Sequence, residues 1–118
     1  MADAAPIQIN REALLDRLME RYNAQDVDAY AAMFTEDGCE GAYRGAVARQ
    51  GRNGIREGYA KVFAEFPQNR ATVLEKFVYG DQILVREHVA RSPEAEPFEV
   101  MAIYSFKGDL IDRVEFIR

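Results

Sequence analysis

A small set of side chains in this sequence could carry acid–base chemistry. His88 is the only histidine among the 118 residues, and imidazole is the side chain whose ordinary pKa lies nearest to neutral pH. Glu40 follows an acidic turn. In an apolar pocket its pKa would be raised by desolvation and lowered by a nearby arginine. Tyr22 and Tyr104 could donate hydrogen bonds to a developing oxyanion. These groups would suit proton abstraction beside a carbonyl, or addition of water to a small apolar molecule.

The charge balance excludes several kinds of partner. Twenty Asp and Glu residues against 15 Lys and Arg residues give a formal net charge of -5. No basic stripe is visible, so we expect neither nucleic acid nor an acidic membrane surface as a partner. The single cysteine, Cys39, allows no intramolecular disulfide, and one His with one Cys cannot build the usual zinc site. We therefore expect no metal and no cofactor.

Length and hydropathy indicate one globular domain. A chain of 118 residues has the size of a single domain, and 48% hydrophobic with 30% charged residues is typical of a soluble protein. No apolar run approaches the roughly 18 residues of a membrane span, and residues 1–6 do not resemble a secretion signal. We expect a cytoplasmic protein with a frayed or disordered start over residues 1–9 and a single domain over residues 10–118.

Three helices are predicted in the first half of the chain. Apolar residues recur at helical spacing over Asn10–Gln25, where Asn10 can cap the first turn. A shorter helix is predicted over Val27–Phe34, with Asp26 as its cap. A third helix should begin near Asn53 and end before Pro67, because proline cannot continue a helix.

The pattern changes to alternation after the third helix. Strands are predicted at Thr72–Tyr79, Gln82–Arg91, Phe98–Phe106 and Leu110–Ile117, with a further candidate at Cys39–Val47. The segment Ala48–Arg52 is predicted to be a polar loop, and Ser92–Pro97 an acidic loop. This order predicts an α+β domain with a curved, mostly antiparallel sheet wrapped by helices.

Both faces of the last strands carry apolar residues. In Phe98–Phe106, for example, Val100 and Ala102 lie on one face, whereas Met101 and Ile103 lie on the other. Helices in a chain this small can cover only one face of a sheet. We therefore predict a homodimer through the convex sheet face, including Met101, Ile103 and Val89.

Four segments carry a resemblance to a known family: Tyr22–Tyr30 (YNAQDVDAY), Met33–Asp37 (MFTED), Gly54–Tyr59 (GIREGY) and Ile103–Val114 (IYSFKGDLIDRV). The chain resembles the nuclear-transport-factor-2-like (NTF2-like) superfamily over nearly its whole length. Within that group it is most similar to ketosteroid isomerases and SnoaL-like proteins. The resemblance implies a cone-shaped α+β fold in which three helices cover the concave side of a bent sheet and enclose an apolar pocket. Because the superfamily includes several enzyme classes and non-enzymatic binders, it does not fix the chemistry.

The catalytic residues of ketosteroid isomerases carry over poorly. An ungapped register places the aspartate base of the isomerases at Ala42, their oxyanion tyrosine at Leu18 and their protonated oxyanion aspartate at Ala102. A supporting tyrosine is retained at Tyr59. Since the isomerase reaction needs a carboxylate base and two acidic donors, the resemblance implies that steroid isomerisation is absent here.

The same register implies which other side chains face the pocket. Tyr22 lies one helical turn after the first-helix position of the family, and Glu40 lies two residues before the base position, so each shares the inward face. The register also turns Arg86 and His88 inward. The predicted catalytic residues are Glu40, His88 and Tyr22, and the predicted substrate-binding residues are Tyr59, Arg86, Tyr104 and Phe116.

Other interpretations of these residues remain open. The hydrophobic pattern of the 82–91 strand would instead bury Ile83, Val85 and Val89, which would leave His88 and Arg86 on a solvated face. Glu40 could belong to an exposed acidic turn, and the tyrosines could be core aromatics with hydrogen-bonded tips. Arg86 could form a structural ion pair with Glu40 or with the glutamate at position 75. The arginines at positions 44, 49 and 52 could be solvated or could form a cationic mouth of the pocket.

Two classes of function follow from these interpretations. One is a small enzyme that uses the pocket for cofactor-free isomerisation, hydration or cyclisation of a small apolar molecule. The other is a non-catalytic domain for ligand binding or dimerisation. A carboxylate or the histidine within hydrogen-bond reach of a ligand-sized cavity would favour the enzyme.

Overall fold

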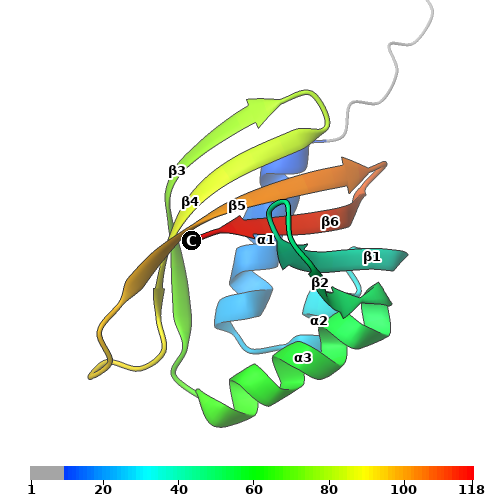
Figure 1. Cartoon of the computed structure of the whole chain (residues 1–118). Coiled ribbons are helices and arrows are strands. Elements are labelled where there is room, and N and C mark those ends of the chain that lie inside the picture. The colour runs from blue at the N-terminus through cyan, green and yellow to red at the C-terminus, as the bar shows by residue number, and fades with distance from the viewer. Residues whose placement is uncertain (1–9) are drawn as a thin grey trace, which may run out of the picture.

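The computed structural model describes residues 10–118, so the expected frayed start over residues 1–9 lies outside the described residues. Three helices pack on one side of a strongly bent six-stranded sheet (Figure 1). The elements in chain order are α1 (Arg11–Asn23), α2 (Val27–Ala31), β1 (Phe34–Ala42), β2 (Val47–Gln50), α3 (Gly51–Glu65), β3 (Arg70–Tyr79), β4 (Gln82–Ala90), β5 (Phe98–Lys107) and β6 (Leu110–Ile117). The predicted α+β fold is confirmed.

Local sequence signals account for most helix boundaries. The side chain of Asn10 accepts a hydrogen bond from the backbone N–H of Ala13 at 3.0 Å. Asp26 does the same for Ala29 at 3.2 Å, so both predicted caps are confirmed. The second helix ends at Ala31, earlier than predicted, because the fully buried Phe34 pairs with Ile111 of β6 and begins β1.

The strands form one sheet in the order β2-β1-β6-β5-β4-β3. All neighbours are antiparallel except β1 and β6, which run parallel. Strand β2 occupies most of the segment that the sequence predicted as a polar loop, and α3 follows it without a break. Gly51 makes this direct strand-to-helix turn with φ +76°, a conformation that favours glycine.

The register of β4 corrects one prediction. Ile83, Val85, Glu87 and Val89 form the buried face of this strand, whereas Arg86 and His88 lie on the opposite, half-buried face. The helices cover the concave face, and burying the aliphatic positions there removes more apolar surface from water. Because successive residues of a strand point to opposite faces of the sheet, one choice of register determines the face on which every side chain of the strand lies.

The hydrophobic core fills the space between the helices and the concave face of the sheet. Leu15 and Leu18 of α1 are fully buried there, as are Ile83 and Val85 of β4. Val89, predicted for the convex dimer face, belongs to this core instead and is only 7% exposed. In the described part of the chain, no helix is both long enough and apolar enough to span a bilayer.

Candidate functional site

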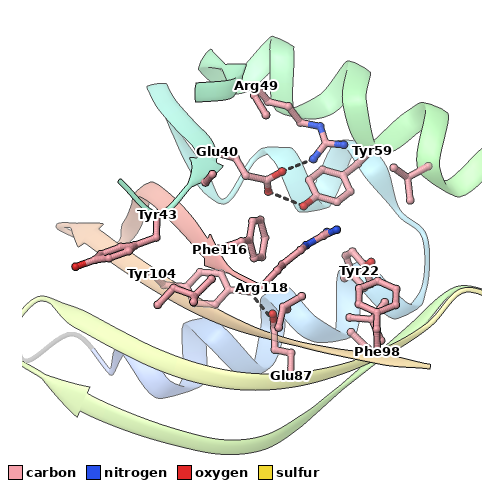
Figure 2. Close-up of a pocket in the computed structure, with 18 of the residues that line it drawn as sticks. Tyr22, Glu40, Tyr43, Arg49, Tyr59, Glu87, Phe98, Tyr104, Phe116 and Arg118 are labelled. Carbon is pink, nitrogen blue, oxygen red and sulfur yellow. Dashed lines mark hydrogen bonds and ion pairs between the residues drawn. The ribbon is translucent and has the colours of Figure 1, made fainter. Parts of the chain in front are cut away.

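A cavity of about 690 Å³ opens between α1, α3 and the concave face of the sheet. Its lining is mainly aromatic and aliphatic. The charged residues that line it are Glu40, Arg49, Glu87, Arg91 and Arg118. Figure 2 shows Glu40 and Glu87 on opposite walls, with Phe116 and Arg118 between them. The cavity therefore holds two carboxylates in an otherwise mostly apolar enclosure.

Glu40 lies near the end of β1 and is 2% exposed. One carboxylate oxygen forms an ion pair with Arg49 of β2, and the other accepts a hydrogen bond from the Tyr59 hydroxyl of α3 at 2.5 Å. Burial raises the pKa of Glu40 above its usual value, and the Arg49 charge opposes that rise. Both oxygens are thus engaged by protein donors.

A glycine in α3 makes room for this ion pair. Arg49 crosses α3 with its guanidinium 4.5 Å from the centre of the Tyr59 ring. A Cβ added at Gly58 would lie 2.0 Å from Nε and 2.5 Å from Cδ of Arg49. Any larger residue at this position would have to displace the arginine that holds Glu40. Gly58 is therefore a positioning feature of the site.

Glu87 provides the second carboxylate, from the middle of β4. It is 4% exposed, and its carboxylate accepts a hydrogen bond from the Tyr104 hydroxyl of β5 at 2.9 Å. Burial raises the pKa of Glu87 to about 7; the Tyr104 hydrogen bond opposes the rise and the charge of Glu40 adds to it. Burial also raises the pKa of Tyr104 well above its usual value, which keeps this hydroxyl a donor at neutral pH.

Tyr22 of α1 brings a hydroxyl to the same cavity. This hydroxyl oxygen accepts a hydrogen bond from Asn69 at 2.6 Å, and Asn69 in turn accepts one from Arg91 at 3.1 Å. The Tyr22 ring packs edge-on against Phe63 and Tyr59, with ring centres 5.3 and 5.9 Å apart. Because Tyr22 acts as acceptor toward Asn69, its own hydroxyl hydrogen can point to a bound molecule.

The structure brings together five of the seven predicted site residues. The residues that line the cavity are Tyr22, Glu40, Tyr59, Tyr104 and Phe116. Arg86 and His88 do not line it, because both lie on the outer face of β4. Arg86 is 38% exposed there and pairs with Glu75 at 2.7 Å and Glu99 at 3.0 Å. The prediction that Arg86 and His88 face the cavity is therefore wrong.

Glu87 is not among the site residues predicted from the sequence, although the sequence contains a signal for it. This glutamate continues the face begun by Ile83 and Val85, and Val89 follows it on the same face. An acidic residue inside an apolar alternation predicts a buried carboxylate, provided that the strand faces the core.

Within residues 10–118, no group of three or more His, Cys, Asp or Glu side chains could hold a metal ion.

Comparisons with known proteins support the architecture. A family model described as "SnoaL-like domain" matches residues 15–114, whereas a search among curated proteins found no match. The chain is similar to an uncharacterised cystatin-fold protein from Novosphingobium aromaticivorans, with 47% identity, a TM-score of 0.86, and coverage of 95% of this chain and 100% of the other.

Two further solved structures extend the likeness. A putative polyketide cyclase from Sinorhizobium meliloti has 25% identity and a TM-score of 0.75, with 89% of this chain and 94% of the other covered. A ketosteroid isomerase-like protein from Catenulispora acidiphila, in complex with trimethylamine, has 16% identity and a TM-score of 0.73, with 94% and 87% covered, and shows the fold alone. The chain therefore belongs to the SnoaL-like domain family and has the NTF2-like fold.

Proposed function

We propose that the cavity binds a small, largely apolar carbonyl compound and that Glu87 exchanges a proton with it, without a cofactor. The observation that carries this proposal is a buried carboxylate that faces a ligand-sized cavity and is held by one hydroxyl donor, Tyr104. The reaction class is isomerisation, hydration or cyclisation. The likeness to a putative polyketide cyclase favours the same class.

The environment of Glu87 suits a group that both takes and returns a proton. With a pKa raised to about 7, both forms of the carboxyl are present at neutral pH. A general base is most effective when its pKa lies near the working pH. Glu40 differs in this respect, since Arg49 and Tyr59 engage both of its oxygens. The predicted catalytic role of Glu40 stays a prediction, and its negative charge supports proton uptake at Glu87.

The proposed step balances within the cavity. The Glu87 carboxylate removes a proton from the carbon beside the carbonyl, and the bonding electron pair moves to the carbonyl oxygen. The Tyr22 hydroxyl donates a hydrogen bond to that oxygen, which stabilises the enolate. In a β,γ-unsaturated carbonyl compound, return of the proton from Glu87 to the γ-carbon completes an isomerisation. In a dicarbonyl compound, the enolate carbon attacks the second carbonyl and closes a ring, and Glu87 returns its proton to the alkoxide that forms.

Hydrogen–deuterium exchange tests the step without knowledge of the natural substrate. In deuterated buffer, the protein should accelerate loss of the α-proton signals of 2-tetralone, followed by proton NMR. Glu87→Gln should reduce this acceleration by about 100-fold or more. Glu94→Gln, in the loop between β4 and β5, is the matched control because it removes an exposed carboxylate.

The pH profile provides an independent check. Since the base acts in its deprotonated form, the exchange rate should rise as pH increases through about 7, the pKa of Glu87. Binding of the ketone without faster exchange would contradict the catalytic proposal and favour the alternative function, a non-catalytic domain that binds small ligands.

A further inference from the structure

Two arginines in the cavity wall have no acidic partner among the described residues. Arg91 and Arg118 both line the cavity, and neither forms an ion pair within residues 10–118. Aromatic rings hold them instead: the Arg91 guanidinium lies 5.3 Å from the ring centres of Phe66 and Phe98, and that of Arg118 lies 5.4 Å from Phe98. The two cations therefore flank one aromatic side chain.

Most of the hydrogen-bonding capacity of these arginines is unused. A guanidinium carries five N–H donors. Among the described residues, Arg91 donates one side-chain hydrogen bond, to Asn69 at 3.1 Å, and Arg118 donates none. Figure 2 shows the Arg118 side chain projecting into the cavity beside Phe116 and toward Tyr22. These donors are available to a bound molecule.

The sign of the charge in the cavity is opposite to that of the chain. The whole sequence has a formal net charge of -5. The cavity lining, in contrast, carries three arginines against two glutamates, one of which has a pKa of about 7. Arg91 is partly buried and Arg118 is exposed, so both cations line the cavity and remain accessible to solvent. Two unpaired, accessible arginines give the cavity of this acidic protein a local positive charge, which can attract an anionic group of a ligand.

We propose that the ligand of this cavity carries a carboxylate, which Arg91 and Arg118 bind, joined to an apolar body that fills the rest of the enclosure. This inference rests on the proposed function to the extent that the cavity takes a small molecule. Guanidinium groups match carboxylates in geometry as well as charge, since two parallel N–H donors meet two oxygens. The substrate class is thus an amphipathic carboxylic acid.

A pair of probes that differ only in charge tests this inference. 2-Naphthoate and its neutral isostere 2-naphthamide should be titrated into the protein by isothermal calorimetry at about pH 6, where an ordinary carboxylic acid is ionised. Glu87, with a pKa of about 7, is then largely neutral and does not repel the acid. We expect the acid to bind about tenfold more tightly than the amide.

Three variants separate the arginines from general charge effects. Arg118→Gln should remove most of the preference for the acid and leave binding of the amide unchanged. Arg91→Gln should do the same, although this residue also supports Asn69, so Arg118 is the primary test. Arg113→Gln is the matched control, because Arg113 is an exposed arginine of β6 that does not line the cavity.

The outcomes distinguish the inference from the proposed function. Equal affinities for acid and amide in the unmodified protein would overturn the inference and leave the proposed function standing. An equal loss of acid binding in Arg113→Gln and Arg118→Gln would also overturn it. If neither probe binds, both the inference and the proposed ligand-binding cavity fail.

Discussion

Glu87 combines two properties that are rarely found together at a purely structural position. It is nearly fully buried, yet it has one hydroxyl donor and no cationic partner among the described residues. A carboxylate in this situation makes the stability of the protein depend on pH, because the folded and unfolded states bind its proton with different affinity.

The pH dependence of stability tests the environment of Glu87. The pKa of this carboxyl is about 7 in the folded protein, against an ordinary value of 4.5. The folded state therefore holds the proton more tightly, and this contribution to stability is fully present below about pH 4.5 and is lost as pH rises through about 7. The free energy of unfolding should fall by roughly 3 kcal/mol over this interval relative to Glu87→Gln. Urea unfolding of both proteins at a series of pH values measures the difference, and parallel curves would contradict it.

A second prediction at this scale concerns the three positions at which ketosteroid isomerases carry their catalytic groups. Ala42 lines the cavity but has no titratable group, and Leu18 and Ala102 are fully buried in the core. We expect no conversion of a β,γ-unsaturated 3-ketosteroid to its conjugated isomer above the buffer rate, followed by ultraviolet absorbance. A genuine ketosteroid isomerase assayed in parallel is the positive control. Comparable turnover by this protein would show that Glu87 and Tyr22 replace the missing groups for this substrate.

At the scale of the element, the packing of Arg49 against α3 depends on the glycine at position 58, which has no side chain. Gly58→Ala should displace Arg49, which leaves the Glu40 carboxylate buried beside Tyr59 without its cation. We expect the pKa of Glu40 to rise further and the protein to lose about 2 kcal/mol or more of stability. Carbon-13 NMR titration of the glutamate carboxyls and thermal unfolding measure the two effects.

A second glycine of the same helix provides the control. A Cβ at Gly54 would meet only the backbone carbonyl carbon of Arg49 at 3.8 Å, an ordinary contact. Gly54→Ala should therefore leave the pKa of Glu40 unchanged and stabilise the helix by up to about 1 kcal/mol. If both variants behave alike, the contact between Gly58 and Arg49 does not position Glu40.

The elements that the sequence predicts well are those with strong local signals. The side-chain caps at Asn10 and Asp26 and the alternation of β4 and β5 are local properties, and each is found in the structure. Strand β2 has four residues with no alternation of burial, and the parallel pairing of β1 with β6 joins residues 74 to 77 positions apart, so no local pattern could predict either.

In the site, the register taken from the family resemblance and the hydrophobic alternation of the strands disagree at one strand, β4. The register of the family resemblance turns four predicted residues inward, and all four line the cavity: Tyr22, Glu40, Tyr59 and Tyr104. In β4 the same register was inverted, because a shift of one residue exchanges the two faces of a strand. The hydrophobic alternation of that strand would have placed its inner face correctly, and Glu87 with it.

At the scale of the whole molecule, no helix within residues 10–118 covers the convex face of the sheet (Figure 1). Phe77 of β3, Leu84 of β4 and Ile103 of β5 are neighbours in register and form an apolar row across this face. Phe77 is 61% exposed. In the adjacent row, Met101 of β5 pairs with Ile117 of β6, which is 42% exposed. An apolar surface of this kind on a sheet is typical of an interface between subunits.

We propose that two copies of the chain pack these convex faces together, with Met101 and Ile103 in the interface. Burying the row against its own copy would remove apolar surface from water on both chains, and a twofold arrangement would match the row with itself. Sedimentation velocity at micromolar concentration should therefore show a dimer.

Ile103→Lys should shift the protein to monomer, because the interface would bury an unpaired ammonium. Val47→Lys, which changes a 48% exposed residue of β2 at the other edge of the sheet, should leave the dimer intact. A monomeric unmodified protein would exclude the arrangement, and a dimer that tolerates Ile103→Lys would place the interface on another surface.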